Sequence, residues 1–153
     1  MGLVVSVKIN IDQPLEALNA LGDDLMMWEE YYKSIGASLV DYFSGQVFIS
    51  QGGVLDEPWP ELSEAYNVWK AEEYPGRPPL VREGEMQESF YYDADDDSLT
   101  IGNSSDHFIY HQSSETREKI PRRVMMAINN DVESIIAYGI DNGITEKLQK
   151  AGF

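Results

Sequence analysis

The chain of 153 residues contains no cysteine, only two histidines, and 11 lysines and arginines against 27 aspartates and glutamates. Without cysteine it cannot form a disulfide, a thiol nucleophile, an iron–sulfur cluster or a cysteine zinc site. No apolar run approaches the roughly 20 residues that a membrane-spanning helix needs, and the N-terminal residues lack the pattern of a signal peptide. We therefore expect a protein that neither spans a membrane nor is secreted.

Hydrophobic residues make up 42% of the chain and aromatic residues 11%. This is the composition of a folded protein, despite the excess of acidic residues. A chain of this length is expected to bury roughly 70% of its unfolded surface around one core. We therefore predict a single domain over residues 1–153.

The excess of acidic residues gives a formal net charge of −16. Duplex DNA would be repelled by such a surface, so sequence-specific DNA binding is disfavoured. Residues 12–97 hold 20 acidic and four basic residues, whereas residues 98–153 hold seven and six. Four of the basic residues lie in residues 117–123, which we call the cationic segment. It suits association between unlike surfaces, and a solvated loop that only aids solubility is the alternative.

The N-terminal third is predicted to hold a strand and then helices. In residues 1–11 apolar side chains occupy every second position, which indicates a half-buried strand or arm. In residues 12–48 apolar side chains recur at steps of three and four, the spacing of one helix face. Glycines at Gly22 and Gly36 are expected to divide this region into two helices, and the sequence leaves the position of the break open.

Residues 50–84 are dense in proline and glycine, which leaves room only for a short helix near residues 60–72. Its neighbourhood is rich in aromatic residues, namely Trp59, Tyr66 and Trp69. Such residues could stack on bases or sugars, but burial where a helix meets a loop is the commoner use. We expect all three in the core.

Residues 85–128 are predicted to contain a β-hairpin and the cationic segment. Residues 85–92 begin as a helical turn and end as a strand, and residues 99–102 form the partner strand across the acidic tip at 93–98. A further strand is predicted at 124–128.

Residues 129–153 are predicted to form a C-terminal helix, interrupted near residues 139–143. The fold class is therefore α+β: long N-terminal helices packed on a small, mostly antiparallel sheet, with a β-hairpin and a C-terminal helix.

The two histidines, His107 and His111, are spaced so that one helix face could present both to a metal. Asp106 and Glu115 lie nearby in the sequence and could add oxygen ligands. However, Phe108 stands where the pattern of zinc proteases has its catalytic glutamate. We interpret the pair as structural.

Asp93, Asp95 and Asp97 match the first three ligand positions of a calcium-binding loop. Ser98 stands where that loop needs glycine, and Ser104 where it needs a bidentate glutamate. An ordinary solvated hairpin tip is the better interpretation. The glycines at 52, 53 and 84 lack the residues of a phosphate-binding loop and are interpreted as turn glycines. We therefore predict no catalytic, cofactor or metal site, and a protein that is not an enzyme.

Several short strings stand in an order that resembles a known family. They are Trp59-Pro60-Glu61-Leu62-Ser63 with Tyr66 and Lys70, Pro79-Leu80, Gly84-Glu85-Met86-Gln87-Glu88-Ser89-Phe90, Leu99-Thr100-Ile101-Gly102, Tyr110-His111-Gln112 and Ile120-Pro121-Arg122-Arg123. Over about residues 12–140 the chain resembles the tailed-phage virion morphogenesis, or tail completion, family. It departs from the family pattern at Ser113-Ser114 and at Val124.

The resemblance implies a structural virion protein that completes the tail or joins head to tail. It would assemble with itself as a hexameric ring in the neck or at the head-proximal end of the tail, next to neck, tail-terminator or tail-tube proteins. DNA would pass through the ring without sequence-specific binding, and an acidic lumen would let the phosphates pass. The expected location is the virion, with the host cytoplasm during assembly; no membrane and no cofactor is implied.

Contact between unlike surfaces of neighbouring subunits needs complementary charge. The cationic segment and the acidic region of residues 12–97 supply it. The residues expected at this interface are Arg117, Lys119, Arg122, Arg123, His111, Gln112, Asp93, Asp95, Asp96 and Asp97. For four residues, scaffolding of loops within one subunit is an equally good interpretation: His111, Gln112, Pro121 and Arg123.

Two other classes of protein stay open. An acidic protein that mimics DNA and inhibits a basic host partner also fits the net charge, and it would be a monomer or dimer. A metal-dependent hydrolase using His107 and His111 would contain zinc or manganese and lose it on substitution of His111.

Overall fold

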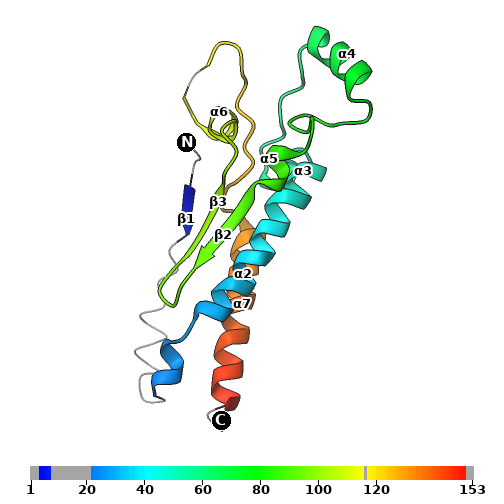
Figure 1. Cartoon of the computed structure of the whole chain (residues 1–153). Coiled ribbons are helices and arrows are strands. Elements are labelled where there is room, and N and C mark those ends of the chain that lie inside the picture. Colours follow the sequence, from blue (N-terminus) through cyan, green and yellow to red (C-terminus); the bar gives the residue numbers. More distant parts are fainter. Residues whose placement is uncertain (1–3, 8–21, 116, 151–153) are drawn as a thin grey trace. The chain divides into compact units, whose positions relative to one another are not determined.

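The computed structural model describes residues 4–7, 22–115 and 117–150 (Figure 1). Its contacts gather into two compact units built from interleaved parts of the chain. Among the described residues, unit 1 consists of 4, 41–91, 102–115 and 117–127, and unit 2 of 5–7, 22–40, 92–101 and 128–150. The single domain expected from the length stays a prediction.

The chain has the predicted α+β fold, with one small sheet whose strands lie in the order β1-β3-β2. These strands are β1 (Val4–Val7), β2 (Phe90–Ala94) and β3 (Leu99–Asn103). β2 and β3 form the predicted hairpin, whose turn is closed by a hydrogen bond from the Asp95 N–H to the Ser98 carbonyl (3.0 Å). The strand predicted in residues 1–11 is confirmed over β1, and its other residues lie outside the described part of the chain.

In unit 2, helix α2 (Glu29–Asp41) buries the face that the apolar spacing predicts. Tyr32, Ile35 and Leu39 are at most 2% exposed. A short 3-10 helix, η2 (Asp23–Met26), precedes α2, and the extended backbone of Met27 separates the two. The break in the helical region therefore lies just before α2, and residues 12–21 of that region lie outside the described part.

The predicted interruption at Gly36 is wrong, because this glycine lies inside α2. A Cβ atom added to Gly36 would lie 2.6 Å from the ring of Tyr92 and 2.9 Å from Leu99, which belong to the hairpin. The missing side chain lets strands and helix approach closely, and this contact outweighs the weak helix propensity of glycine.

Helix α7 (Asn130–Lys150) completes unit 2 and is uninterrupted, so the predicted break near residues 139–143 is wrong. Its first turn is capped by Asn129, whose side-chain oxygen accepts the N–H of Val132 (2.9 Å). A Cβ atom at Gly139 would collide with Cγ1 of Ile35, and one at Gly143 would lie 2.8 Å from the ring of Trp28. The two glycines therefore let α7 lie against α2 (Figure 1).

In unit 1 the helical run continues directly from α2 and ends at residue 49, close to the predicted end. Its two parts are a π-helix, η3 (Tyr42–Gln46), and α3 (Val47–Ile49). Four short helices follow: η4 (Gly53–Leu55), α4 (Glu64–Glu73), α5 (Glu85–Glu88) and α6 (Phe108–Gln112).

The core of unit 1 is a cluster of buried aromatic rings. Phe90 contacts Phe43 (6.1 Å between ring centroids), Phe48 (6.2 Å) and Phe108 (5.7 Å). Phe48 also meets the edge of Trp59 at 5.1 Å. Trp59 is 6% exposed, which confirms its predicted place in the core.

Candidate functional site

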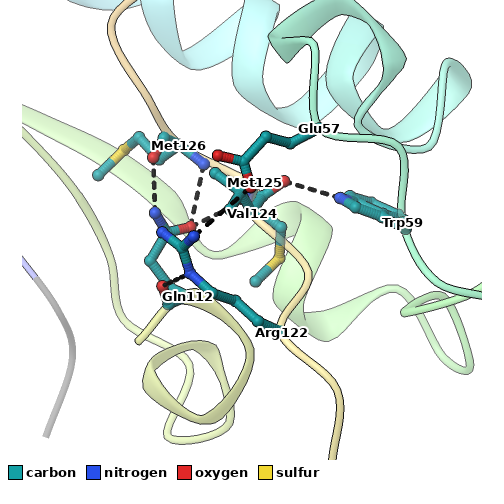
Figure 2. A network of polar contacts seen from close by, with 7 residues as sticks. All are labelled: Glu57, Trp59, Gln112, Arg122, Val124, Met125 and Met126. Carbon is teal, nitrogen blue, oxygen red and sulfur yellow. Dashed lines mark hydrogen bonds and ion pairs between the residues drawn. The ribbon is translucent and has the colours of Figure 1, made fainter. Parts of the chain in front are cut away.

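Helix α6 ends at Gln112, a residue that is 8% exposed and binds the backbone of a distant segment. Its Oε1 accepts the N–H groups of Met125 (2.9 Å) and Met126 (3.1 Å), and its Nε2 donates to the Met126 carbonyl (2.6 Å) (Figure 2). The strand predicted for residues 124–128 is wrong, because this side chain supplies the hydrogen bonds that a neighbouring strand would otherwise make.

Three further contacts fix the same segment (Figure 2). Trp59 Nε1 donates to the Val124 carbonyl at 2.7 Å. Arg122 Nε donates to the Gln112 carbonyl at 3.2 Å, and its Nη1 lies 3.5 Å from the Glu57 carboxylate. Gln112 and Arg122 thus hold loops together within the chain.

Two cations are buried in unit 1, Lys70 at 3% and Arg123 at 4% exposure. Arg123 Nη2 donates to the carbonyls of Pro60 (2.8 Å) and Glu61 (3.1 Å), and Nε also donates to Pro60 (2.9 Å). Lys70 Nζ donates to the Pro78 carbonyl. Burial lowers the pKa of both groups, and the charge of Arg123 lowers that of Lys70 further. Neither cation forms an ion pair with any residue in the described ranges.

Lys70 and Arg123 line a cleft of about 830 Å³, which we call the unit 1 cleft. Its volume is in the range of small-ligand sites. Apolar side chains form part of the wall, among them Leu62, Tyr66, Leu80, Met86, Ile120 and Pro121. The other charged or titratable residues of the wall are Glu61, Arg82, Glu83, Glu85, His107, His111 and Lys119.

His111 is half-buried in the wall of this cleft, and its buried Nδ1 has no hydrogen-bond partner among the described residues. Burial, with the charge of Arg123 adding to it, lowers the pKa of His111 to about 4. The imidazole is therefore neutral in the folded protein at neutral pH.

The lowered pKa of His111 predicts a dependence of stability on pH. Between pH 6.5 and about pH 4 the unfolded state binds a proton that the folded state does not, so stability falls as the pH falls through this window. Over this pH window we expect the free energy of unfolding of the wild type to fall by about 2 kcal/mol more than that of the variant His111→Asn. This figure allows for solvent screening of the half-buried imidazole. Urea unfolding at several pH values measures this difference. The exposed His107→Asn serves as control, and equal slopes for wild type and His111→Asn would contradict the prediction.

The ten residues predicted at the interface lie in both units. His111, Gln112 and the cationic segment belong to unit 1, and the four aspartates belong to unit 2. Within the cationic segment, Arg117 lies over the ring of Tyr110 (4.6 Å) and 3.7 Å from the Glu115 carboxylate, whereas Lys119 is exposed.

Two aspartates of the hairpin tip accept hydrogen bonds from backbone N–H groups within unit 2. Asp95 Oδ1 accepts the N–H groups of Asp97 (2.9 Å) and Ser98 (2.7 Å), which holds the pKa of Asp95 below its usual value. Asp96 Oδ1 accepts the N–H groups of Trp28 (2.7 Å) and Glu29 (2.9 Å). The tip therefore closes its own turn and caps α2.

Across the described ranges no group of three or more histidines, aspartates and glutamates is placed to hold a metal ion. Asp95 matches a calcium-binding loop only in its spacing, and its Oδ1 accepts two backbone N–H groups instead.

Helix α4 has an unusual pattern of exposure that the sequence did not reveal. Its only buried residue is Lys70. Tyr66, Val68 and Trp69 are 40%, 57% and 41% exposed, so the predicted burial of Tyr66 and Trp69 is wrong. The rings of Tyr66 and Trp69 lie 5.3 Å apart, and Trp69 also meets Tyr74 at 5.9 Å. We call Tyr66, Val68 and Trp69 the α4 face.

Comparisons with protein-family models, with curated proteins and with solved structures give no match to this chain. None of the helices in the described ranges is long and apolar enough to cross a membrane.

Proposed function

We propose that this chain is a structural virion protein of a tailed bacteriophage, a tail completion or head–tail joining component. It assembles as a ring around the DNA channel, in the neck or at the head-proximal end of the tail. The ordered strings of residues between about 12 and 140 suggest this family. The observation that carries the proposal is the α4 face, because an assembly protein needs an exposed surface that is stable only against a partner.

The α4 face has the properties of a protein-binding surface. A helix on the surface of a monomer normally turns its apolar residues inward, whereas α4 is anchored by a lysine and exposes three large apolar side chains. Tryptophan and tyrosine are the residues that most often dominate binding energy at interfaces. Clustered apolar exposure of this kind marks interaction sites more often than chance.

Charge supports the same proposal. A net charge of −16 suits the wall of a DNA channel, where lysines and arginines would hold the phosphates. Within the cationic segment, however, Arg123 is buried and Arg122 lies near Glu57. We therefore assign contact between subunits to the α4 face and to Lys119 rather than to the whole segment.

Weakening the α4 face tests the proposal. The double variant Val68→Ser, Trp69→Ser should keep the fold, because both side chains are exposed, and should associate about tenfold more weakly. Native mass and light scattering measure this, on the chain alone and mixed with purified phage tails or DNA-filled heads. Tyr138→Ser, which removes a ring that is 71% exposed in unit 2, is the matched control.

The wild type should form a ring, expected to be a hexamer, or remain a monomer that co-sediments with particles. A double variant that assembles as well as wild type would remove the α4 face from the interface. A stable monomer or dimer that ignores particles and captures a basic host protein would contradict the proposal and favour the DNA mimic.

A further inference from the structure

The unit 1 cleft combines features that a ligand site requires. It is large enough for a small organic molecule, and its wall holds both apolar side chains and two cations that are at least 96% buried. Buried charges are normally paired with opposite charge. Lys70 and Arg123 instead have only backbone carbonyls as partners among the described residues.

Both cations retain donors for a further partner. Lysine has three N–H donors and arginine has five. The hydrogen bonds of Arg123 use Nε and Nη2, which leaves Nη1, and Lys70 uses one donor on Pro78. A group with negative charge would satisfy these donors and neutralise the buried charge.

The exposed charges of the cleft do not supply that neutralisation. Glu83 lies 3.8 Å from Arg82, and Glu85 accepts a hydrogen bond from Ser105 (3.2 Å). Glu61, the third acidic residue of the wall, contacts Arg123 through its backbone carbonyl (3.1 Å) rather than its carboxylate. The uncompensated charge therefore lies with Lys70 and Arg123, on a chain that is otherwise strongly acidic.

We propose that the unit 1 cleft binds an oxyanion, a carboxylate or phosphate carried on a partly apolar molecule, at Lys70 and Arg123. The oxyanion makes charge-assisted hydrogen bonds with the two cations. The apolar part contacts the side chains of Leu62, Leu80 and Met86. The group comes either from a free small molecule or from an acidic side chain on a second copy of this chain. The inference does not depend on the phage assignment.

His111 reports on occupancy, because it lies in the wall of the cleft. The full chain is titrated with glutarate and with inorganic phosphate, and with chloride at matched ionic strength, while the imidazole signals of His111 are followed by NMR. We expect a saturable shift with glutarate or phosphate and a rise of about one unit in the pKa of His111, because a negative charge nearby favours the imidazolium. Chloride should give neither effect.

Substitution identifies the cation. Lys70→Met keeps an unbranched side chain one atom shorter and removes the charge, and it should weaken binding roughly tenfold or more. Lys150→Met, at the exposed end of α7 in unit 2, removes the same charge elsewhere and should leave binding unchanged. The titrations of wild type stand on their own if Lys70→Met does not fold.

A second arm distinguishes the source of the oxyanion. If His111 signals move with chain concentration, and Lys70→Met abolishes that dependence, the group is a carboxylate of a second copy. The proposal is wrong if two results are found together. Glutarate and phosphate shift the His111 signals no more than chloride does, and the signals do not change with chain concentration. That result would leave the α4 face and its assembly test untouched.

Discussion

Replacing Gln112 by alanine should lower the free energy of unfolding by about 4 kcal/mol, because three buried backbone groups lose their partner. These are the N–H groups of Met125 and Met126 and the carbonyl of Met126. Met125 and Met126 are at most 3% exposed, so water cannot easily replace the lost bonds. A buried donor left without a partner costs about 1–3 kcal/mol.

Urea unfolding followed by tryptophan fluorescence measures the loss, with Gln46→Ala as control. Gln46 is exposed, and its truncation should change stability by less than about 0.5 kcal/mol. Gln112→Glu separates the two halves of the network, since a carboxylate accepts both N–H groups but cannot donate to Met126. Its stability should lie between those of wild type and Gln112→Ala. A Gln112→Ala variant as stable as the control would show that the network does not hold the segment.

The segment that Gln112 binds could not be predicted correctly from the sequence. The apolar run at 124–128 has the composition of a strand, and its residues Val124, Met125 and Met126 are buried as a strand would be. What it lacks is a neighbouring strand, and the pattern within a segment carries no information about its partner. A glutamine 13 residues away takes that place.

Elements that bury one regular face were predictable. The spacing of Tyr32, Ile35 and Leu39 identified the buried face of α2, and the hairpin followed from two apolar runs on either side of an acidic turn. The role of the glycines inside the helices was not predictable from the sequence. Gly36 and Gly139 were expected to break helices, but each makes room for a packed neighbour, and that neighbour is distant in the sequence.

The candidate site was less predictable than the fold. His111 and Arg123 were identified from the sequence as interface residues. The cleft also needs Lys70, which was noted only among the family-like strings, because a lysine on a short helix is normally solvated. The exposure of Trp69 was missed for the related reason that an aromatic residue beside a proline-rich loop is usually buried. Both errors concern α4, in which the lysine is buried and the aromatic residues are exposed, the reverse of the usual pattern.

Replacing Gly52 by alanine should destabilise the chain by about 3 kcal/mol or more. Gly52 has φ of +82°, a left-handed conformation that costs a residue with a side chain about 1–2 kcal/mol. A Cβ atom there would also collide with the Glu57 carbonyl and lie 2.6 Å from the ring of Trp59. The carbonyl belongs to a turn in which Gly52 itself accepts the N–H groups of Leu55 (3.0 Å) and Glu57 (3.3 Å), so it cannot move away without breaking that turn.

Gly45→Ala is the matched control, because nothing lies within 4 Å of a Cβ atom there and the residue is helical. Removing a glycine from a helix should leave stability unchanged or raise it by up to about 1 kcal/mol. Opposite signs for the two substitutions, measured by urea unfolding, would show that the turn rather than glycine content controls stability.

The same clash moves Trp59, whose Nε1 donates to the Val124 carbonyl, so Gly52→Ala should also loosen the segment that Gln112 binds. Faster amide hydrogen exchange at Met125 and Met126 in Gly52→Ala, but not in Gly45→Ala, is the expected result. Unchanged exchange at both methionines would mean that Gln112 holds them independently of Trp59.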